Sequence, residues 1–157
     1  MIEDNLLYII FFHVLGAIIW VGGMIAIRFA VHPALQNIDD TQVRLARTLE
    51  ITGRLFALVF PFIIIILATG LMMASAFGFS GHTDLSTIVH VKEAVWLIMT
   101  LNYGAMIYIR FKAQSAYLAS DFATTKKLLA PVAKYMLPIN IFLGVMELFF
   151  GLILRGF

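Results

Sequence analysis

Ionisable side chains inside long apolar stretches are the first candidates for chemistry in this 157-residue sequence. They are His13, His90, Lys92, Glu93 and Glu147. An ionisable group inside a bilayer is costly unless a partner satisfies it, so by default it marks a functional site. Imidazole can bind a metal or move a proton, and a lysine or a glutamate can act as an acid, a base or a fixed charge. The sequence therefore makes Lys92 and Glu147 candidate catalytic residues. The position of His13 inside an apolar span is the feature that most requires a functional explanation.

The elements that must position these residues are membrane helices. Hydrophobic residues make up 62% of the chain and charged residues 13%, whereas charged residues are about 25% of an ordinary soluble domain. Four apolar spans are predicted at about 6–29, 55–76, 86–109 and 132–154, each near the ~20 residues that a helix needs to cross a bilayer. The expected fold is all-α, a single integral membrane four-helix bundle over residues 1–157. The opening residues 1–5 are acidic, so the first helix is expected to be retained rather than removed as a signal peptide.

Lysine and arginine gather in the first and third predicted connections and their flanks. Because positively charged loops stay in the cytoplasm, both termini are expected on the periplasmic side of a bacterial inner membrane. The net charge of +2 then reflects topology, so the lipid bilayer is the expected partner and nucleic acid is not. The basic residues assigned to the inner side are Arg28, Arg44, Arg47, Arg54, Arg110, Lys112, Lys126, Lys127 and Lys134.

In this orientation the ionisable residues share one depth, in the outer leaflet, at ~1.5 Å of rise per residue. His13 also shares a helical stripe with Gly16 and Trp20, and small residues on such a stripe let a helix or a flat ligand approach closely. His90 and Lys92 are separated by roughly 200° around their helix, so both cannot point to one place.

Two histidines at similar depth on separate helices are what a non-covalent haem b needs as axial ligands. The sequence has no cysteine, which excludes covalent c-type attachment and iron–sulfur clusters. The leading hypothesis is one haem b per chain, with the iron held by His13 and His90 and with Gly16, Trp20 and Lys92 beside the cofactor. Met72 or Met73 is an alternative second ligand.

Two other interpretations stay open. Thioethers and imidazoles suit Cu(I), so His13, His90, Met72 and Met73 would serve a copper-handling protein. Alternatively, His13 and Lys92 pair with glutamates in a purely structural cluster. Homodimers are also conceivable, because Gly70, Gly104 and Gly151 would permit close helix contacts either within one chain or between two.

Short motifs in all four spans resemble small four-helix membrane proteins of the CopD and HemJ type. The motifs are His13-Val14-Leu15-Gly16 with Trp20 and Gly22-Gly23, then Arg54-Leu55-Phe56 with Pro61 and Thr69-Gly70-Leu71, then His90-Val91-Lys92, and Asn140 with Gly144. HemJ-type proteins are haem b-binding protoporphyrinogen IX oxidases, so the resemblance implies a haem-ligand role for His13 and an essential cation at Lys92. CopD-type proteins are associated with copper uptake.

The function expected from these observations is that of an inner-membrane haem b redox protein. It would transfer electrons or oxidise a hydrophobic porphyrin- or quinone-like partner, as a protoporphyrinogen oxidase does. Copper binding and uptake is the alternative function, and the sequence leaves open whether the chain is an oxidoreductase in its own right.

Overall fold

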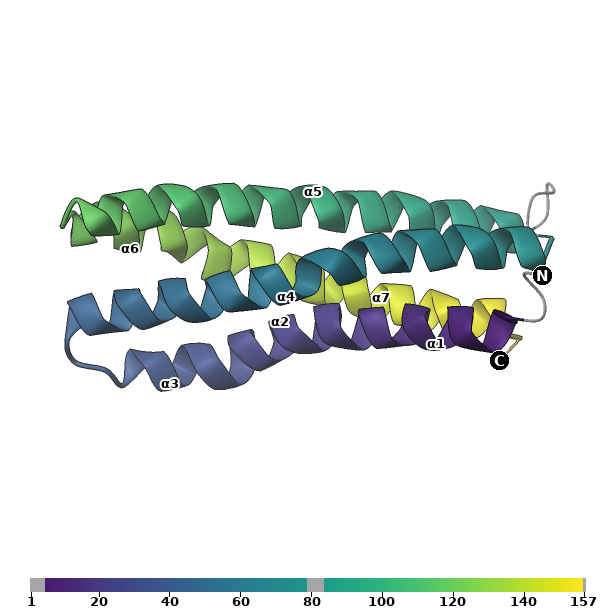
Figure 1. Cartoon of the computed structure of the whole chain (residues 1–157), viewed down its shortest axis with the longest axis horizontal. Coiled ribbons are helices and arrows are strands. Elements are labelled where there is room, and N and C mark those ends of the chain that lie inside the picture. Colours follow the sequence, from purple (N-terminus) through teal and green to yellow (C-terminus); the bar gives the residue numbers. More distant parts are fainter. Residues whose placement is uncertain (1–4, 79–83, 157) are drawn as a thin grey trace.

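The computed structural model describes residues 5–78 and 84–156, and these residues form helices joined by short turns. Four long helical rods lie side by side (Figure 1), and each is long and apolar enough to cross a membrane. The rods cover Leu6–Gln36, Thr41–Ala76, Leu85–Leu118 and Phe122–Leu154. For the described residues, the expected all-α architecture with four helices long and apolar enough to span a membrane is therefore confirmed. The rods extend past the predicted spans. Most of the connection between the second and third predicted spans, and of the acidic opening, lies outside the described residues.

Two of the rods are interrupted by wider, π-helical turns. The first rod consists of α1 (Leu6–Ala17), η2 (Ile18–Gly22), α2 (Gly23–Ala26), η3 (Ile27–Val31) and α3 (His32–Gln36). The fourth consists of α6 (Phe122–Pro131), η4 (Val132–Met136) and α7 (Leu137–Leu154). Turns η3 and η4 each end two residues before a proline, Pro33 or Pro138. Proline lacks an N–H and its ring crowds the carbonyl four residues earlier, which accounts for these two wide turns. No proline follows η2 in this way, and η2 contains Trp20.

The second and third rods are the single helices α4 (Thr41–Ala76) and α5 (Asp84–Leu118). Helix α1 begins, α7 ends, α4 ends and α5 begins at the same end of the bundle (Figure 1). At the opposite end, aspartates cap the helices that follow each turn. Asp40 Oδ1 accepts hydrogen bonds from the backbone N–H groups of Gln42 and Val43, and Asp121 Oδ1 accepts one from Thr124. Hydrogen bonding from Thr124 lowers the pKa of the Asp121 carboxyl below its usual value.

The centre of the bundle is built on one buried aromatic group. Tyr103 of α5 lies edge-on to both Trp20 and Phe56, at ring-centroid distances of 6.2 and 5.4 Å. Its hydroxyl donates to the backbone carbonyl of Phe56 on α4. All three side chains are at most 5% exposed, so the group ties the first three rods together.

Asparagines join the third rod to the fourth. Asn140, which is fully buried, donates to the carbonyl of Met99 at 3.1 Å and accepts from Asn102 Nδ2 at 2.7 Å. Asn102 also donates to the carbonyl of Met136, the last residue of η4, at 2.9 Å. Bonds of this kind contribute modestly, about 0.6 kcal/mol each on average between membrane helices, but they fix the rotation of α7 relative to α5. That rotation decides which α7 residues face inward.

Close packing of α7 gives a testable contrast between two glycines. A methyl group on Gly144 would lie 2.5 Å from Cγ2 of Val21, a stiff β-branched side chain, whereas one on Gly104 would meet no atom within 4 Å. We expect Gly144→Ala to lower the free energy of unfolding by about 1–3 kcal/mol through overpacking. Gly104→Ala is expected to raise it by up to about 1 kcal/mol through helix propensity. Unfolding in detergent micelles measures both, and an unchanged Gly144→Ala variant would contradict the packing.

Candidate functional site

A cavity of about 60 Å³ lies among the four rods within their apolar spans. Its polar lining comes from three rods: His13 and Trp20 from the first, Lys92 and Trp96 from α5, and Glu147 from α7. Apolar side chains, including Ile66 of α4, complete the wall. We call this space the polar cavity. It brings together four of the residues that the sequence singled out, together with Trp96.

Lys92 and Glu147 form an ion pair across α5 and α7. Lys92 Nζ lies 2.8 Å from Glu147 Oε2 and donates a second hydrogen bond, also of 2.8 Å, to the backbone carbonyl of Glu147. The two side chains are only 20% and 19% exposed. Glycine at position 151 leaves room for the ammonium, which lies 4.0 Å from where a Cβ would be. The pair thus meets the requirement that a charge buried away from water be paired and hydrogen-bonded.

His13 is held by a threonine of the neighbouring rod. Its Nδ1 lies 2.9 Å from Thr69 Oγ1 of α4, and that hydroxyl donates its single proton to the carbonyl of Ile65 at 2.6 Å. Both contacts are satisfied together only if Nδ1 carries the ring proton and donates it to Thr69. We assign this tautomer from the network. Nε2 of His13 then carries a lone pair that can accept a proton or bind a metal.

Glycines of the two rods allow this arrangement. The position of a Cβ on Gly70 would lie 3.4 Å from Cε1 of His13, so the imidazole packs directly over the backbone of α4. Gly16 is buried against the side chain of Ile66, 2.8 Å from the position of its missing Cβ. The structure therefore places Gly16 at the contact between α1 and α4 rather than in the lining of the cavity, while Trp20 does line it.

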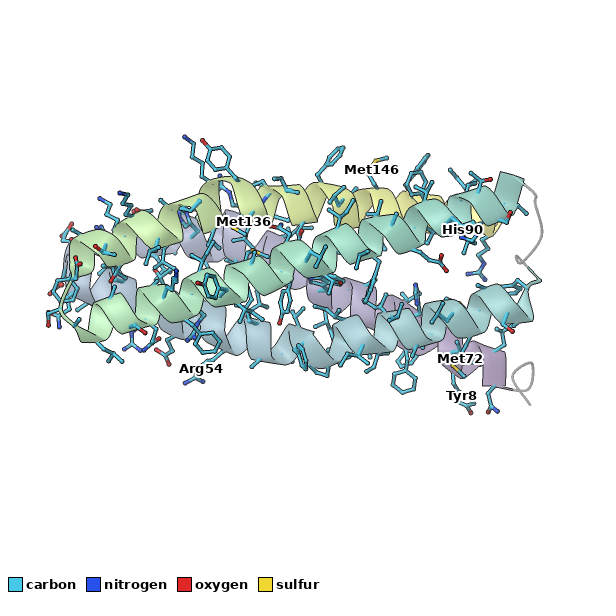
Figure 2. All side chains as sticks on the ribbon, turned by 90° about the horizontal axis from the view of Figure 1, so that it is seen from above. Tyr8, Arg54, Met72, His90, Met136 and Met146 are labelled. Atoms are coloured by element: carbon cyan, nitrogen blue, oxygen red, sulfur yellow. The ribbon has the colours of Figure 1, made fainter. Side chains whose placement is uncertain are left out.

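His90 is not brought to His13. Its side chain is 74% exposed, and its Nδ1 contacts Oε2 of Glu93 at 3.1 Å on the outer face of α5 (Figure 2). Lys92, two residues along the same helix, faces α7 instead. The divergence of His90 and Lys92 expected from helical phase is what the structure shows, and it leaves His90 out of the polar cavity.

The methionines proposed as ligands also lie outside the cavity lining. Met72 is 40% exposed and Met73 is half-buried near the end of α4 (Figure 2 labels Met72). Within residues 5–78 and 84–156, no group of three or more His, Cys, Asp or Glu side chains is placed to hold a metal ion. Among the described residues, the polar cavity therefore has one imidazole, that of His13, and no preassembled set of metal ligands.

Sequence analysis did not predict that two residues, Thr69 and Trp96, would belong to the candidate site. Thr69 lies mid-helix in α4, where a threonine hydroxyl usually bonds to its own helix backbone, as Thr69 also does. Trp96 follows Lys92 by four residues, which places both on one helix face, but an indole in a span is ordinarily read as packing. Two features of the sequence could have indicated these residues. They are the pair Thr69-Gly70 within an apolar span and the i, i+4 spacing of Lys92 and Trp96.

Comparisons of the chain with protein-family models, with curated proteins and with solved structures find no match. A function therefore has to be inferred from the polar cavity itself. Its features are a tautomer-fixed imidazole, a desolvated ion pair and two indoles within a membrane-spanning bundle.

Proposed function

We propose that the protein is a multi-pass bacterial inner-membrane redox protein, with both termini periplasmic, that acts on a hydrophobic substrate and uses His13 beside the polar cavity to hold its redox cofactor. The arginines and lysines assigned to the inner side support this orientation through the positive-inside rule. The motif resemblance to CopD- and HemJ-type proteins supports haem b as the redox cofactor. Porphyrinogen- or quinol-like molecules are the substrate class, because they reside in the membrane and release protons when they are oxidised.

The observation that carries this proposal is the free Nε2 of His13. A histidine that binds a metal almost always donates its other ring N–H to a fixed partner, which sets its tautomer and orientation. The bond from His13 Nδ1 to Thr69 is such a partner.

The fit of haem to these residues is partial. The donor chemistry of His13 suits one axial bond to the iron, but His90 faces away from the cavity and supplies no second bond in this arrangement. Ligand pockets are typically about 300–1,000 Å³, so a cavity of about 60 Å³ does not enclose a porphyrin. Lys92 is also engaged by Glu147 rather than free for a propionate. When bound, haem would supply a one-electron acceptor, and we derive no reaction step through it.

The chain's own residues have defined roles in this proposal. Nε2 of His13 would hold the haem iron, while Thr69 holds the ring in place. The Lys92–Glu147 pair keeps the cavity electrically neutral as a whole.

The visible spectrum of the detergent-purified protein tests the proposal. We expect a Soret band after haem supplementation, and we expect His13→Ala to lose it, because the variant lacks the imidazole that binds the iron. His90→Ala is the matched control, since that exposed ring lies outside the cavity; it is expected to retain the band. A wild-type protein with no Soret band, or full haem retention by His13→Ala, would overturn the proposal.

A further inference from the structure

Positively charged side chains that lie over exposed aromatic rings gather in one half of the bundle. Each charged group lies 4.7–5.7 Å from the centre of a ring, and each of these rings is 55–68% exposed. We call the four contacts the cation–aromatic collar. They are Arg28 with Phe29 on the first rod, Arg110 with Phe111 and Lys112 with Tyr108 on α5, and Lys134 with Tyr135 on the fourth rod.

Contacts between the rods show that the collar occupies one band across the bundle. Three contacts between neighbouring rods lie at a common level. They are Gly23 with Leu55, Tyr103 with Phe56, and Asn102 with Met136. Each collar cation lies within about ten residues of this level, on the side of the turn between α3 and α4, opposite the end where α1 begins and α7 ends (Figure 1). At ~1.5 Å of rise per residue, the cations share a band roughly 11 Å deep.

The distance from the collar to the other end of the apolar spans matches a bilayer. Toward that end, about 20 residues separate each collar cation from another polar side chain on the same rod, which corresponds to the ~30 Å hydrocarbon thickness of a membrane. The separated residues are Tyr8 and Arg28 on the first rod, His90 and Arg110 on α5, and Lys134 and Arg155 on the fourth rod. Figure 2 labels Tyr8 and His90 near one end of the bundle and Arg54 toward the other. The collar therefore lies at the level of one layer of lipid head groups.

The protein does not neutralise the charge of the collar. Within residues 5–78 and 84–156, Arg28, Lys112 and Lys134 form no ion pair, since the ion pairs there involve other cations. Arg110 donates from Nε and Nη2 to the backbone carbonyl of Leu49 at 3.1 and 2.9 Å, and this acceptor is neutral. The collar thus keeps four positive charges, and a negative group that balances them has to come from outside the described chain.

We propose that the cation–aromatic collar binds the head groups of anionic phospholipids. Lysine and arginine beside a membrane span attract anionic lipids, and amphipathic tyrosine rings lie at head-group level. The exposed rings hold the cations at the perimeter of the bundle, where a lipid phosphate can approach them. A soluble acidic protein fits less well, because the rings face the lipid at this depth. The inference requires that the rods cross a bilayer, but it does not depend on haem.

Spin-labelled lipids test this preference in the folded protein, reconstituted in phosphatidylcholine vesicles. We expect the wild type to immobilise labelled phosphatidylglycerol about fivefold more strongly than labelled phosphatidylcholine, the effect of about one surface cation. Lys112→Gln combined with Lys134→Gln should lower this preference below about twofold. Lys126→Gln combined with Lys127→Gln is the matched control, because it removes the same charge from exposed lysines of α6 that lie over no ring in the described structure. The control should stay close to the wild-type preference.

Replacing the rings separates the collar from a general effect of charge. Tyr108→Leu combined with Tyr135→Leu keeps every cation but removes the rings beneath two of them, so the preference should fall to about half of the wild-type value. Circular dichroism confirms that each variant is folded. Equal immobilisation of the two lipids by the wild type would overturn the proposal and leave an acidic protein as the partner. An equal loss in the two lysine pairs would also overturn it, because net charge alone would then explain the preference. Neither result affects the Soret band.

Discussion

Lys92→Met is expected to destabilise the folded protein by roughly 3–5 kcal/mol, because it strands the Glu147 carboxylate in the interior without its counter-charge. The side chains of the pair are about one-fifth exposed, which places the expected value near the lower end. Glu147→Gln should have a similar effect by stranding the Lys92 ammonium, although the bond from Nζ to the carbonyl of residue 147 can persist. Unfolding in mixed detergent micelles measures both effects.

The double variant shows whether each single change lowers stability by breaking the ion pair or merely by altering a buried position. Lys92→Met with Glu147→Gln leaves no buried charge, so most of the lost stability should return. Glu93→Gln is the matched control on the same helix. Its partner His90 is 74% exposed, and exposed pairs contribute about 0–1 kcal/mol. If the two single changes proved additive in the double variant, the ion pair would not be the source of the effect.

The sequence predicted the four spans and the shared depth of the ionisable residues, because both depend only on local composition and on the rise per residue. It also predicted that His90 and Lys92 diverge, since residues two apart lie on different helix faces. Its leading hypothesis nevertheless placed His90 at the iron with Lys92 beside the cofactor, whereas the structure turns Lys92 toward α7 and His90 to the outer face. That choice is made by the rotation of α5 against α7, which depends on Asn102 and Asn140 and on the close contact between Gly144 and Val21.

The contact partners of individual side chains could not be predicted from the sequence either. Lys92 had two candidate acids, and Glu93 is nearer in sequence, but adjacent residues of a helix do not face each other. Lys92 pairs with Glu147 instead, because Gly151 on α7 leaves room for the lysine ammonium. The contact of His13 with Thr69 needs the crossing of α1 over α4 at Gly16 and Gly70. Such crossings are properties of pairs of helices, and no single stretch of sequence contains them.

Thr69→Val is expected to weaken haem binding by about 10–100-fold, the usual effect of losing the residue that orients a metal-binding histidine. This corresponds to about 1.4–2.7 kcal/mol of binding free energy. Valine keeps the shape of threonine but cannot accept the Nδ1–H of His13, so the ring loses its fixed tautomer and rotation. Titration of haem into the detergent-solubilised protein, followed by Soret absorbance, measures the change in affinity.

Two further variants decide whether orientation is the cause. Thr69→Ser keeps the hydroxyl and should restore most of the affinity. Thr100→Val removes a buried hydroxyl that has no partner among the described residues, so it should leave affinity and folding nearly unchanged. In the haem-free protein, ¹⁵N shifts of His13 should indicate Nδ1–H in the wild type and a mixture of tautomers in Thr69→Val. If the wild-type proton lay on Nε2 instead, that nitrogen would have no free lone pair, and its assignment as the iron ligand would fail.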